Sequence, residues 1–382
     1  ITIGDWSSDV CSSDLGIDLG TSTCYVECLF PNGLPFPLLD SGNDECIESC
    51  VGYTVRNGTR KVRYGKAARS QCREAVVYEM KRLIGKKYGC KDFEEDLKRW
   101  PFAVVEGANG MAEIEIVVNK EKERESPVVH VSRLLEYIRS LIVEKLDRDY
   151  LVKTVITVPH RFGTEERNAT LEAATLAGFP EVELFSEPSA GALAYYTADP
   201  SQLEGKTVCV YDFGGGTFDV TIVEVKNRQF NVKASDGDLH LGGADIDSLL
   251  MAYYLEQTDS TKSANDLKPR NRIKLIEKCR QCKHELSRSD TTDLSDEGTI
   301  ILTRERFNNL IQPIIAKTIE VTRNCIFRWN RPVSDLDGFL LIGGSSEIPL
   351  VSTMLKEAFG RPLITKISPH TAVRDGALAY AK

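Results

Sequence analysis

The sequence predicts an α/β protein made of two duplicated lobes, each with a mixed sheet, covering helices and a smaller inserted subdomain. Residues 208–225 (VCVYDFGGGTFDVTIVEV) contain an apolar run, an aspartate, three glycines and a returning strand with alternating apolar residues. Residues 16–23 (GIDLGTST) repeat the order of apolar residues, Asp, Gly and Thr, and residues 24–30 continue as a strand. Because the same turn opens each half of the chain, the sequence indicates an internal duplication.

The glycine turn in the second half has the composition of a phosphate cradle. Gly214, Gly215 and Gly216 can adopt positive φ angles, and without Cβ atoms they let backbone N–H groups approach an anion closely. The Asp212 carboxylate can hold a hydrated Mg²⁺, and the Thr217 hydroxyl can donate to phosphate oxygens. A tight hairpin between two buried strands would use the same glycines, so the triplet alone leaves both interpretations open.

The second copy of the turn favours the phosphate interpretation. In that copy an aspartate again precedes the turn, and the turn consists of Gly20, Thr21, Ser22 and Thr23. We therefore expect Asp18 and Asp212 to organise one hydrated metal ion. Both turns would then clamp one polyphosphate from opposite sides.

At these residues the chain resembles the heat-shock-seventy (DnaK-type) chaperone family, which belongs to the actin-like ATPase superfamily. The matching segments, in chain order, are IDLGTSTC, MKRLIGKKYG, VITVPHRFGTEERNATLEAATLAGF, SEPSAGALAYY, VYDFGGGTFDVTIVEV, HLGGADID and LLIGGSSEIPLV. The agreement covers most of residues 16–382. The resemblance implies the two-lobed actin-like ATPase fold, with a nucleotide cleft between the duplicated lobes.

The expected domain boundaries follow from the positions of the two turns. Residues 1–15 (ITIGDWSSDVCSSDL) look like a translated sequencing adaptor, and we expect them to be a non-native leader. Lobe I is expected over residues 16–203, with an inserted subdomain at about 48–125. Lobe II is expected over residues 204–382, with an inserted subdomain at about 243–302. We expect no substrate-binding domain within these residues.

The composition is that of a globular protein: 382 residues, 42% hydrophobic and a net charge of −8. No run of about 18 apolar residues is present, so we expect no membrane span, and the acidic balance argues against a nucleic-acid surface. The one C-x-x-C pair, Cys279 and Cys282, has no second ligand pair, which argues against a zinc site. Reduced thiols and a cytoplasmic location are the simplest expectation.

Hydrophobic spacing predicts further elements along the chain. We expect a helix near 74–83, a helix at 129–146, a buried strand at 153–158, a helix capped by Thr164 and stopped at Gly178, a helix at 189–196, and a mostly helical subdomain at 248–302 with a hairpin at about 291–303. The family resemblance makes the helix at 189–196 one of two that cross between the lobes.

The resemblance also assigns roles to two charged residues outside the turns. In the family, the lysine that matches Lys81 orients the water that attacks the γ-phosphate, a role that a cation can fill. Glu187 matches a carboxylate near the water shell of the metal. From the residues alone, a solvent-exposed Lys81–Arg82 pair and an acid in the first turn of a helix are natural alternatives. The resemblance favours catalytic roles for Lys81, Glu187 and Asp212.

The remaining nucleotide contacts that the resemblance implies lie in lobe II. They are Gly242 and Gly243 near the phosphates, Lys283 and Ser287 at the adenosine, and Gly343, Gly344 and Ser345 at the base. This half departs from the family pattern at Arg280, His284, Glu347 and His370. Glu347 takes the place of the arginine that stacks on adenine. We therefore expect intact phosphate binding and weakened contacts to the base.

We expect Mg²⁺-dependent binding of ATP and ADP, with slow ATP hydrolysis that opens and closes the cleft, as in a chaperone motor domain. Two alternatives stay open: a non-hydrolysing, nucleotide-gated binding module, and a small-molecule kinase of the same superfamily, against which KRLIG and SEPSAGALAY argue. The implied partners are the nucleotide and a nucleotide-exchange factor or co-chaperone. Glu183 stands where the family has a basic residue that helps to dock the J-domain, which argues against that contact.

Overall fold

The computed structural model describes residues 13–30, 32–56, 59–72, 75–94, 96–98, 100, 102–146, 151–258, 266–267, 269–295 and 298–382. The chain forms two compact units. Unit 1 comprises the chain up to Ala190 together with Arg374–Lys382, and unit 2 comprises Gly191–Val373. The boundary therefore lies earlier than the expected position at residue 203, and the end of the chain returns to unit 1.

The main sheet of unit 1 has the strand order β12-β11-β1-β2-β3, with β4 also paired to β2. Its strands are β1 (Ser13–Leu19), β2 (Thr23–Leu29), β3 (Pro35–Pro37), β4 (Cys46–Glu48), β11 (Leu151–Val158) and β12 (Val182–Ser186). Strand β1 is antiparallel to β2 and parallel to β11, which in turn is parallel to β12. Most of the expected leader lies outside the described residues, but Ser13–Leu15 belong to β1 and Leu15 is fully buried.

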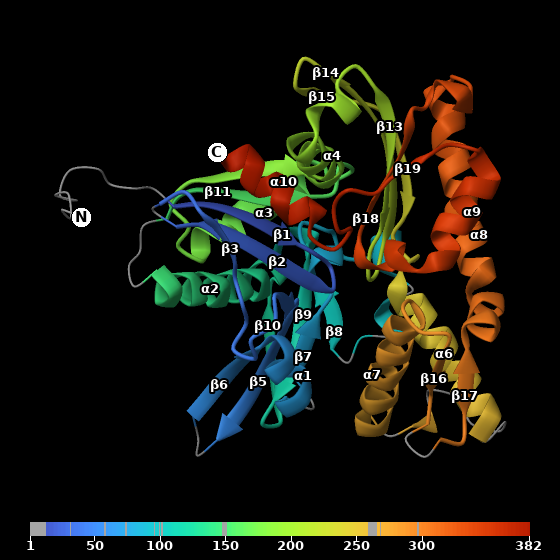
Figure 1. The fold of residues 1–382 in the computed structure, drawn as a ribbon. Coiled ribbons are helices and arrows are strands. Elements are labelled where there is room, and N and C mark those ends of the chain that lie inside the picture. Colours follow the sequence, from blue (N-terminus) through green and yellow to red (C-terminus); the bar gives the residue numbers. More distant parts are fainter. Residues whose placement is uncertain are drawn as a thin grey trace, which may run out of the picture. The chain divides into compact units, whose positions relative to one another are not determined.

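Helices cover both faces of this sheet (Figure 1). Because side chains alternate along a strand, Ile17 packs in the core with α2 (Pro127–Leu146) and α3 (Thr164–Leu176), while Gly16 faces the other way. There, a Cβ on Gly16 would collide with the backbone of Leu378 in α10 (Ala372–Ala381). On the same face as Gly16, Val155 packs against Ala377 and Ala381.

A buried arginine fixes the last helix to unit 1. Arg374 is 7% exposed, and its guanidinium contacts Asp375 at 2.8 Å, Glu45 at 3.2 Å and Glu27 at 3.8 Å. Burial would lower the pKa of Arg374, but these carboxylates raise it above its usual value. The chain segment that returns to unit 1 is therefore held by buried charge as well as by apolar packing.

The stretch expected to be an inserted subdomain of the first half contains two three-stranded sheets, β6-β5-β7 and β10-β9-β8. Their elements are β5 (Cys50–Arg56), β6 (Thr59–Tyr64), α1 (Gly65–Gln71), β7 (Val76–Tyr78), β8 (Ala103–Glu106), β9 (Ala112–Val118) and β10 (Glu121–Glu125), with 3₁₀ turns at Met80–Arg82, Lys91–Phe93, Asp96–Lys98 and Ala108–Gly110. The helix expected near 74–83 is wrong. Strand β7 pairs with β5 there, and Glu79 at φ 55° redirects the chain into the first 3₁₀ turn.

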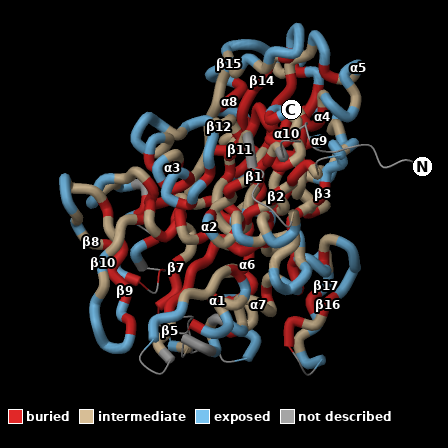
Figure 2. The backbone as a smooth tube through the Cα atoms, turned by 90° about the vertical axis from the view of Figure 1, so that its left-hand side faces the viewer, coloured by how far each residue is buried: buried red, intermediate tan, exposed pale blue. Residues whose placement is uncertain are grey.

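Unit 2 repeats the topology of the main sheet of unit 1. Its sheet has the order β19-β18-β13-β14-β15, with strands β13 (Thr207–Phe213), β14 (Phe218–Lys226), β15 (Gln229–Asp238), β18 (Gly338–Ile342) and β19 (Leu363–Ile364). As in unit 1, the first two strands form an antiparallel hairpin, and the first strand lies parallel to a later one. This repetition confirms the predicted duplication. Strand β18 is buried along its whole length, and Figure 2 shows how buried and exposed residues are distributed along the backbone.

Several helices and a short hairpin complete unit 2. They are α5 (Pro200–Leu203), α6 (Gly243–Thr258), α7 (Pro269–Leu286), α8 (Arg304–Trp329), α9 (Pro349–Phe359), 3₁₀ turns at Val333–Asp335 and Gly344–Glu347, and the hairpin of β16 (Thr291–Asp293) and β17 (Ile301–Thr303). At the start of helix α8 the Thr303 hydroxyl accepts a hydrogen bond from the Arg306 amide. The helix is ended by Asn330, a C-cap residue in the left-handed conformation. Its buried face packs on the sheet, where Thr318 and Tyr211 share a 2.6 Å hydrogen bond.

The expectations for the helices at 129–146, 164–178 and 189–196 have clear outcomes. The helix expected at 129–146 is α2, and the helix expected at 189–196 is α4 (Glu187–Ala198), which the boundary between the units divides. The expected cap at Thr164 is wrong, because Gly163 is the N-cap and no side chain caps α3. Gly178 ends that helix as predicted, at φ 82°. Among the described residues, no helix is both long and apolar enough to cross a membrane.

Candidate functional site: two half-sites built on repeated turns

The first half-site lies at the turn between β1 and β2 of unit 1. Leu19 and Cys24 pair across the hairpin, so Gly20–Thr23 form a four-residue turn. A Cβ on Gly20 would collide with the Thr23 carbonyl oxygen, which explains the glycine. Thr21 and Ser22 are partly exposed, so part of each residue is accessible to a ligand.

Ser49, which the sequence analysis did not identify, holds this turn through two hydrogen bonds. The Ser49 hydroxyl donates to the Gly20 carbonyl oxygen at 2.7 Å, and the Ser49 amide donates to the Ser22 carbonyl oxygen at 2.9 Å. Ser49 is 4% exposed and also contacts the Cys24 thiol at 3.2 Å. Burial raises the pKa of that thiol to about 12, so Cys24 is a packing residue.

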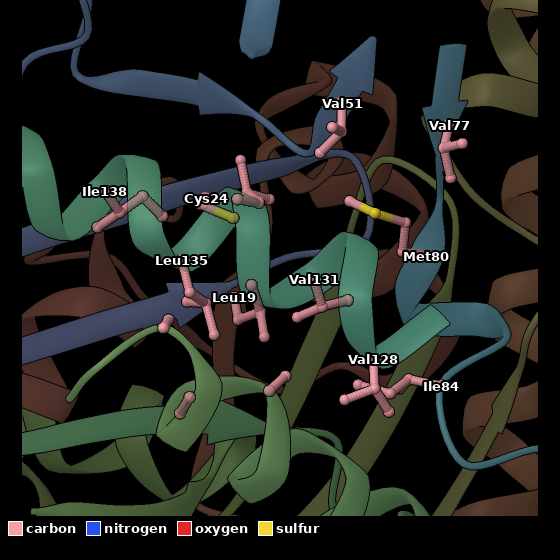
Figure 3. Close-up of a cluster of buried hydrophobic side chains, with 14 of the residues drawn as sticks. Leu19, Cys24, Val51, Val77, Met80, Ile84, Val128, Val131, Leu135 and Ile138 are labelled. Atoms are coloured by element: carbon pink, nitrogen blue, oxygen red, sulfur yellow. The ribbon is translucent and has the colours of Figure 1, made fainter. Parts of the chain in front are cut away.

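Lys81 lies largely out of solvent beside this turn, so the solvent-exposed alternative is wrong. Its neighbours Met80 and Ile84 insert into the core under α2 (Figure 3), which fixes the 3₁₀ turn that carries it. The Lys81 side chain is 9% exposed and forms an ion pair with Glu187, the first residue of α4. Arg82 is also buried and pairs with Asp96 at 3.1 Å.

Asp18 completes the charged cluster of unit 1. Its carboxylate accepts a hydrogen bond from the Thr157 hydroxyl at 3.3 Å. Burial, followed by the charge of Glu187, raises the pKa of Asp18 to about 7. Burial would lower the pKa of the Lys81 ammonium, but Glu187 and Asp18 together raise it above its usual value. Two carboxylates thus share one ammonium ion in a poorly solvated place.

A small cavity connects these parts of unit 1. It has a volume of about 10 Å³, room for about one water molecule. Its walls include Gly20, Ser49 and Lys81, together with apolar side chains of the core. The structure therefore brings the turn and the lysine to one place within unit 1.

The second half-site is the turn between β13 and β14 of unit 2. Phe213 and Phe218 pair across the hairpin, so residues 214–217 form a four-residue turn like that of unit 1. The expectation of positive φ angles at Gly214, Gly215 and Gly216 is wrong, since none of them adopts one. Close backbone packing accounts for the lack of side chains instead.

The glycine pair in HLGGADID supplies that packing. A Cβ on Gly242 would lie 2.6 Å from the backbone of Gly216. The Gly243 amide donates to the Gly214 carbonyl oxygen at 3.0 Å, and the Ala244 amide donates to that of Gly215 at 2.7 Å. The Gly242 amide donates to Asp245 at 2.8 Å. The amides of Gly242 and Gly243 thus donate to acceptors within the protein. The two glycines pack against the β13–β14 turn, whereas the sequence analysis expected their backbone to approach phosphate directly.

Asp212 and Ser345 lie against the same turn. Gly343 has φ 78°, and a Cβ there would lie 2.6 Å from a carboxylate oxygen of Asp212. Ser345 is 7% exposed, and its hydroxyl donates to the Gly214 carbonyl oxygen at 2.8 Å. Gly343 thus leaves room for the Asp212 carboxylate beside the turn.

The expected adenosine residues, Lys283 on α7 and Ser287 just after its end, have partners within the protein. Lys283 is buried; its ammonium lies 2.6 Å from Asp247 and donates to the Gly243 carbonyl oxygen at 2.9 Å. Burial lowers its pKa, although Asp247 opposes the shift. The Ser287 hydroxyl donates to the Lys283 carbonyl oxygen at 3.2 Å. Asp247 belongs to HLGGADID, so its position in that motif was the available clue to this partner.

The residues that depart from the family pattern are near enough to interact, since the charges of Arg280 and His370 both act on His284. His370 packs on Gly344, where a Cβ would collide with its ring, and His370 Nε2 lies 3.1 Å from Glu347 Oε2. Arg280 lies 3.7 Å from Asp247. Glu347 therefore faces an imidazole at the position where the resemblance implies an arginine.

The fold and the two half-sites define a class of protein: an α/β protein of two duplicated halves, each with an Asp-x-Gly-x-x-Thr turn suited to phosphate. Comparison with known proteins assigns the chain to a family within this class. The family model described as "Hsp70 protein" matches residues 14–382, and the chain belongs to the Hsp70 family. Its mixed α/β architecture agrees with the two-lobed actin-like ATPase fold of that family.

Curated relatives support the same assignment. The chain is 33% identical over 377 residues to a "Heat shock cognate HSP70 protein" of Trypanosoma brucei brucei, with 95% of this chain and 55% of the relative covered. It is 30% identical to proteins named "Chaperone protein DnaK" from Buchnera aphidicola, over 385 residues with 95% and 58% covered, and from Thermus thermophilus, over 384 residues with 96% and 60% covered. The chain thus spans less than two thirds of these relatives, and the matched region is the nucleotide-binding ATPase domain.

Proposed function

We propose that this chain binds Mg²⁺-ATP through both turns and hydrolyses it slowly. The observation that carries the proposal is the cluster of unit 1, where Lys81, Glu187 and Asp18 lie together, largely withdrawn from solvent, beside the partly exposed turn at Thr21 and Ser22. Gathering a lysine and two carboxylates in a poorly solvated place costs desolvation free energy, and perturbed carboxylates of this kind are found preferentially at functional sites. The Hsp70 family assignment supports the same chemistry.

The residues present fit a hydrated magnesium ion. Burial and then the charge of Glu187 raise the pKa of Asp18, so two carboxylates stand beside the single Lys81 ammonium, and Mg²⁺ prefers carboxylate and water oxygens. Among the described residues, no group of three or more His, Cys, Asp or Glu could hold a metal directly. We propose that Asp18 and Asp212 each hold the ion through its water shell. When bound, the ion would neutralise charge on the phosphate oxygens.

Lys81 acts in this proposal as a donor and a positive charge. Its raised pKa keeps the ammonium protonated at neutral pH, so it cannot serve as a general base. The ion pair with Glu187 fixes its direction, and the remaining N–H groups can orient a water molecule against the terminal phosphate. Thr21, Ser22 and Thr217 would donate to phosphate oxygens.

The proposal extends to partners only in part. Hydrolysis would drive opening and closing of the nucleotide site, and a nucleotide-exchange factor or co-chaperone would act on that cycle. Glu183, expected to oppose J-domain docking, accepts a hydrogen bond from Tyr380 and lies 3.3 Å from Lys153. Because its carboxylate is engaged and negative, we propose no J-domain contact at this position.

The test is single-turnover release of γ-phosphate by wild type and Lys81→Ala. We expect the variant to keep Mg²⁺-ATP affinity within a few fold and to lose about 10²- to 10⁴-fold in rate. Lys87→Ala, which removes an exposed lysine from the same segment, is the matched control and should turn over normally. Equal rates for Lys81→Ala and wild type would contradict the proposal. Binding without release would favour the non-hydrolysing module, and transfer to an added sugar would favour the kinase.

A further inference from the structure

A serine hydroxyl holds each of the two turns at the equivalent carbonyl group. Ser49 donates to the Gly20 carbonyl oxygen at 2.7 Å, and Ser345 donates to the Gly214 carbonyl oxygen at 2.8 Å. Gly20 and Gly214 are equivalent, because each is the first residue of its four-residue turn. Both serines are buried, so neither hydroxyl has bulk water as an alternative partner.

The two serines come from elements that the duplication does not relate. Ser49 lies between β4 and β5, whereas Ser345 lies in the 3₁₀ turn that follows β18. Strand β18 is the counterpart of β11 in unit 1, and β4 has no counterpart in the path of the unit 2 sheet. The same contact has therefore been built twice from different parts of the fold, which points to a requirement of the turn.

The geometry of the peptide bond explains why the turn would need its first carbonyl group to be held. All peptide bonds of the described residues are trans, so an N–H group points away from the C=O group of the preceding residue. Fixing the Gly20 carbonyl fixes the direction of the Thr21 N–H group, and fixing the Gly214 carbonyl fixes that of Gly215. Within the part of the chain that the structure describes, neither of these two N–H groups has an acceptor.

We infer that Ser49 and Ser345 are paired positioning residues, which aim the Thr21 and Gly215 amides at the phosphates of the bound nucleotide. This inference rests on the proposed function and assigns to Ser345 a role different from a contact with the base. Preorganised amides bind an anion without the cost of turning their peptide planes. The two serines thus increase the affinity for phosphate groups and leave the affinity for the nucleoside unchanged.

The experiment compares Mg²⁺-ATP and adenosine binding by calorimetry in wild type, Ser49→Ala and Ser345→Ala. We expect each variant to bind Mg²⁺-ATP about tenfold more weakly, the effect of losing about one charge-assisted hydrogen bond. Adenosine affinity should stay within twofold of wild type, because adenosine carries no phosphate. Ser49→Thr, which keeps the hydroxyl, should recover most of the loss and tests the hydroxyl separately from folding.

Two other serines provide matched controls. The Ser132 hydroxyl donates to the Val129 carbonyl oxygen at 2.9 Å, and that of Ser346 donates to the Ile342 carbonyl oxygen at 2.6 Å. Both are buried, and neither donates to a carbonyl of a phosphate turn, so their alanine variants should keep wild-type Mg²⁺-ATP affinity.

Three outcomes would overturn the inference. They are unchanged Mg²⁺-ATP affinity in folded Ser49→Ala and Ser345→Ala, equal loss of adenosine and Mg²⁺-ATP affinity, and equal loss in the Ser132 and Ser346 controls. Failure of the wild type to bind Mg²⁺-ATP would instead overturn the proposed function, so the two failures are distinguishable.

Discussion

Asp18 is a residue whose ionised carboxylate is suited to a cationic ligand but lowers the stability of the ligand-free protein. Burial and the nearby Glu187 charge make its ionised form costly, which raises its pKa to about 7. The folded protein therefore holds a proton that the unfolded chain has already released above the ordinary value of 3.8. By linkage, this group makes the ligand-free protein less stable as the pH rises between those two values.

We predict that Asp18→Asn unfolds at a higher temperature than wild type at pH 8, and that the difference shrinks as the pH falls towards 4. The reason is that asparagine removes a buried charge that exists only at the higher pH. The measurement is the thermal midpoint of the nucleotide-free protein at several pH values. Asp238→Asn is the control with the opposite sign, because the Lys317 ion pair at 2.6 Å outweighs burial and lowers the pKa of Asp238. A pH-independent gain for Asp18→Asn would contradict this account.

Motif residues could be predicted at this scale, but their supporting partners could not. Asp18, Lys81 and Glu187 stand in recognisable segments, and the structure places them together. Ser49 lies in no motif, because its role depends on a hydrogen bond to a residue 29 positions away. The sequence predicted the glycines after Asp212 to be needed for positive φ angles, but close packing requires them. A glycine in a sequence shows only that a side chain is absent, and it does not show whether a backbone torsion or a close contact is the cause.

At the scale of elements, the four-residue turns and the segments packed behind them act as units. The β13–β14 turn rests on the start of α6 through two backbone hydrogen bonds, and Lys283 of α7 in turn holds Asp247 and Gly243 of α6. This chain of contacts occupies groups that were expected to contact the nucleotide. Hydrophobic periodicity predicted α2, α4 and the β13–β14 hairpin, but it could not show which side chains of α7 point inwards.

The 3₁₀ turn at Gly344–Glu347 carries the largest departure from the family pattern. A carboxylate cannot stack as a planar cation on adenine, so we predict weaker and less base-selective binding of ATP than the resemblance alone implies. Glu347→Arg should shift the preference for ATP over GTP by about fivefold or more, if one good contact of about 1 to 3 kcal/mol is regained.

Competition of ATP against GTP on wild type and variant measures this shift. Glu347→Gln is the matched control, because it removes the charge that faces His370 without adding a cation. Strong preference for ATP in the wild type, unaltered in both variants, would mean that other contacts select the base.

At the scale of the whole molecule, the path of the chain between the two units matters most. Unit 2 is one continuous segment, whereas unit 1 is made of two segments that are far apart in sequence. The sequence predicted the duplication from the repeated turns. It did not predict that Arg374–Lys382 return to unit 1, because small residues such as Gly376 and Ala377 fit many packing partners.

We predict that Ala377→Asp selectively destabilises unit 1. Ala377 is fully buried against Val155, so the substitution would place an unpaired carboxylate in an apolar contact, at a cost of several kcal/mol. Hydrogen exchange should show lost protection in β1 and β11 and retained protection in β13 and β18. Lys382→Asp, at an exposed position of the same segment, should leave both units protected. Uniform loss of protection in all four strands would contradict independent cores.

The return of the last nine residues also has a consequence for synthesis on the ribosome, where a chain is made from its first residue to its last. All described residues of unit 2 have been made once Val373 has emerged, since the described residues after Val373 belong to unit 1. Unit 1 starts before unit 2 and is completed after it, because α10, which covers the face of its sheet around Gly16 and Val155, lies in Arg374–Lys382. During translation this apolar face is exposed, so it is the surface through which a nascent chain would associate with neighbouring polypeptides.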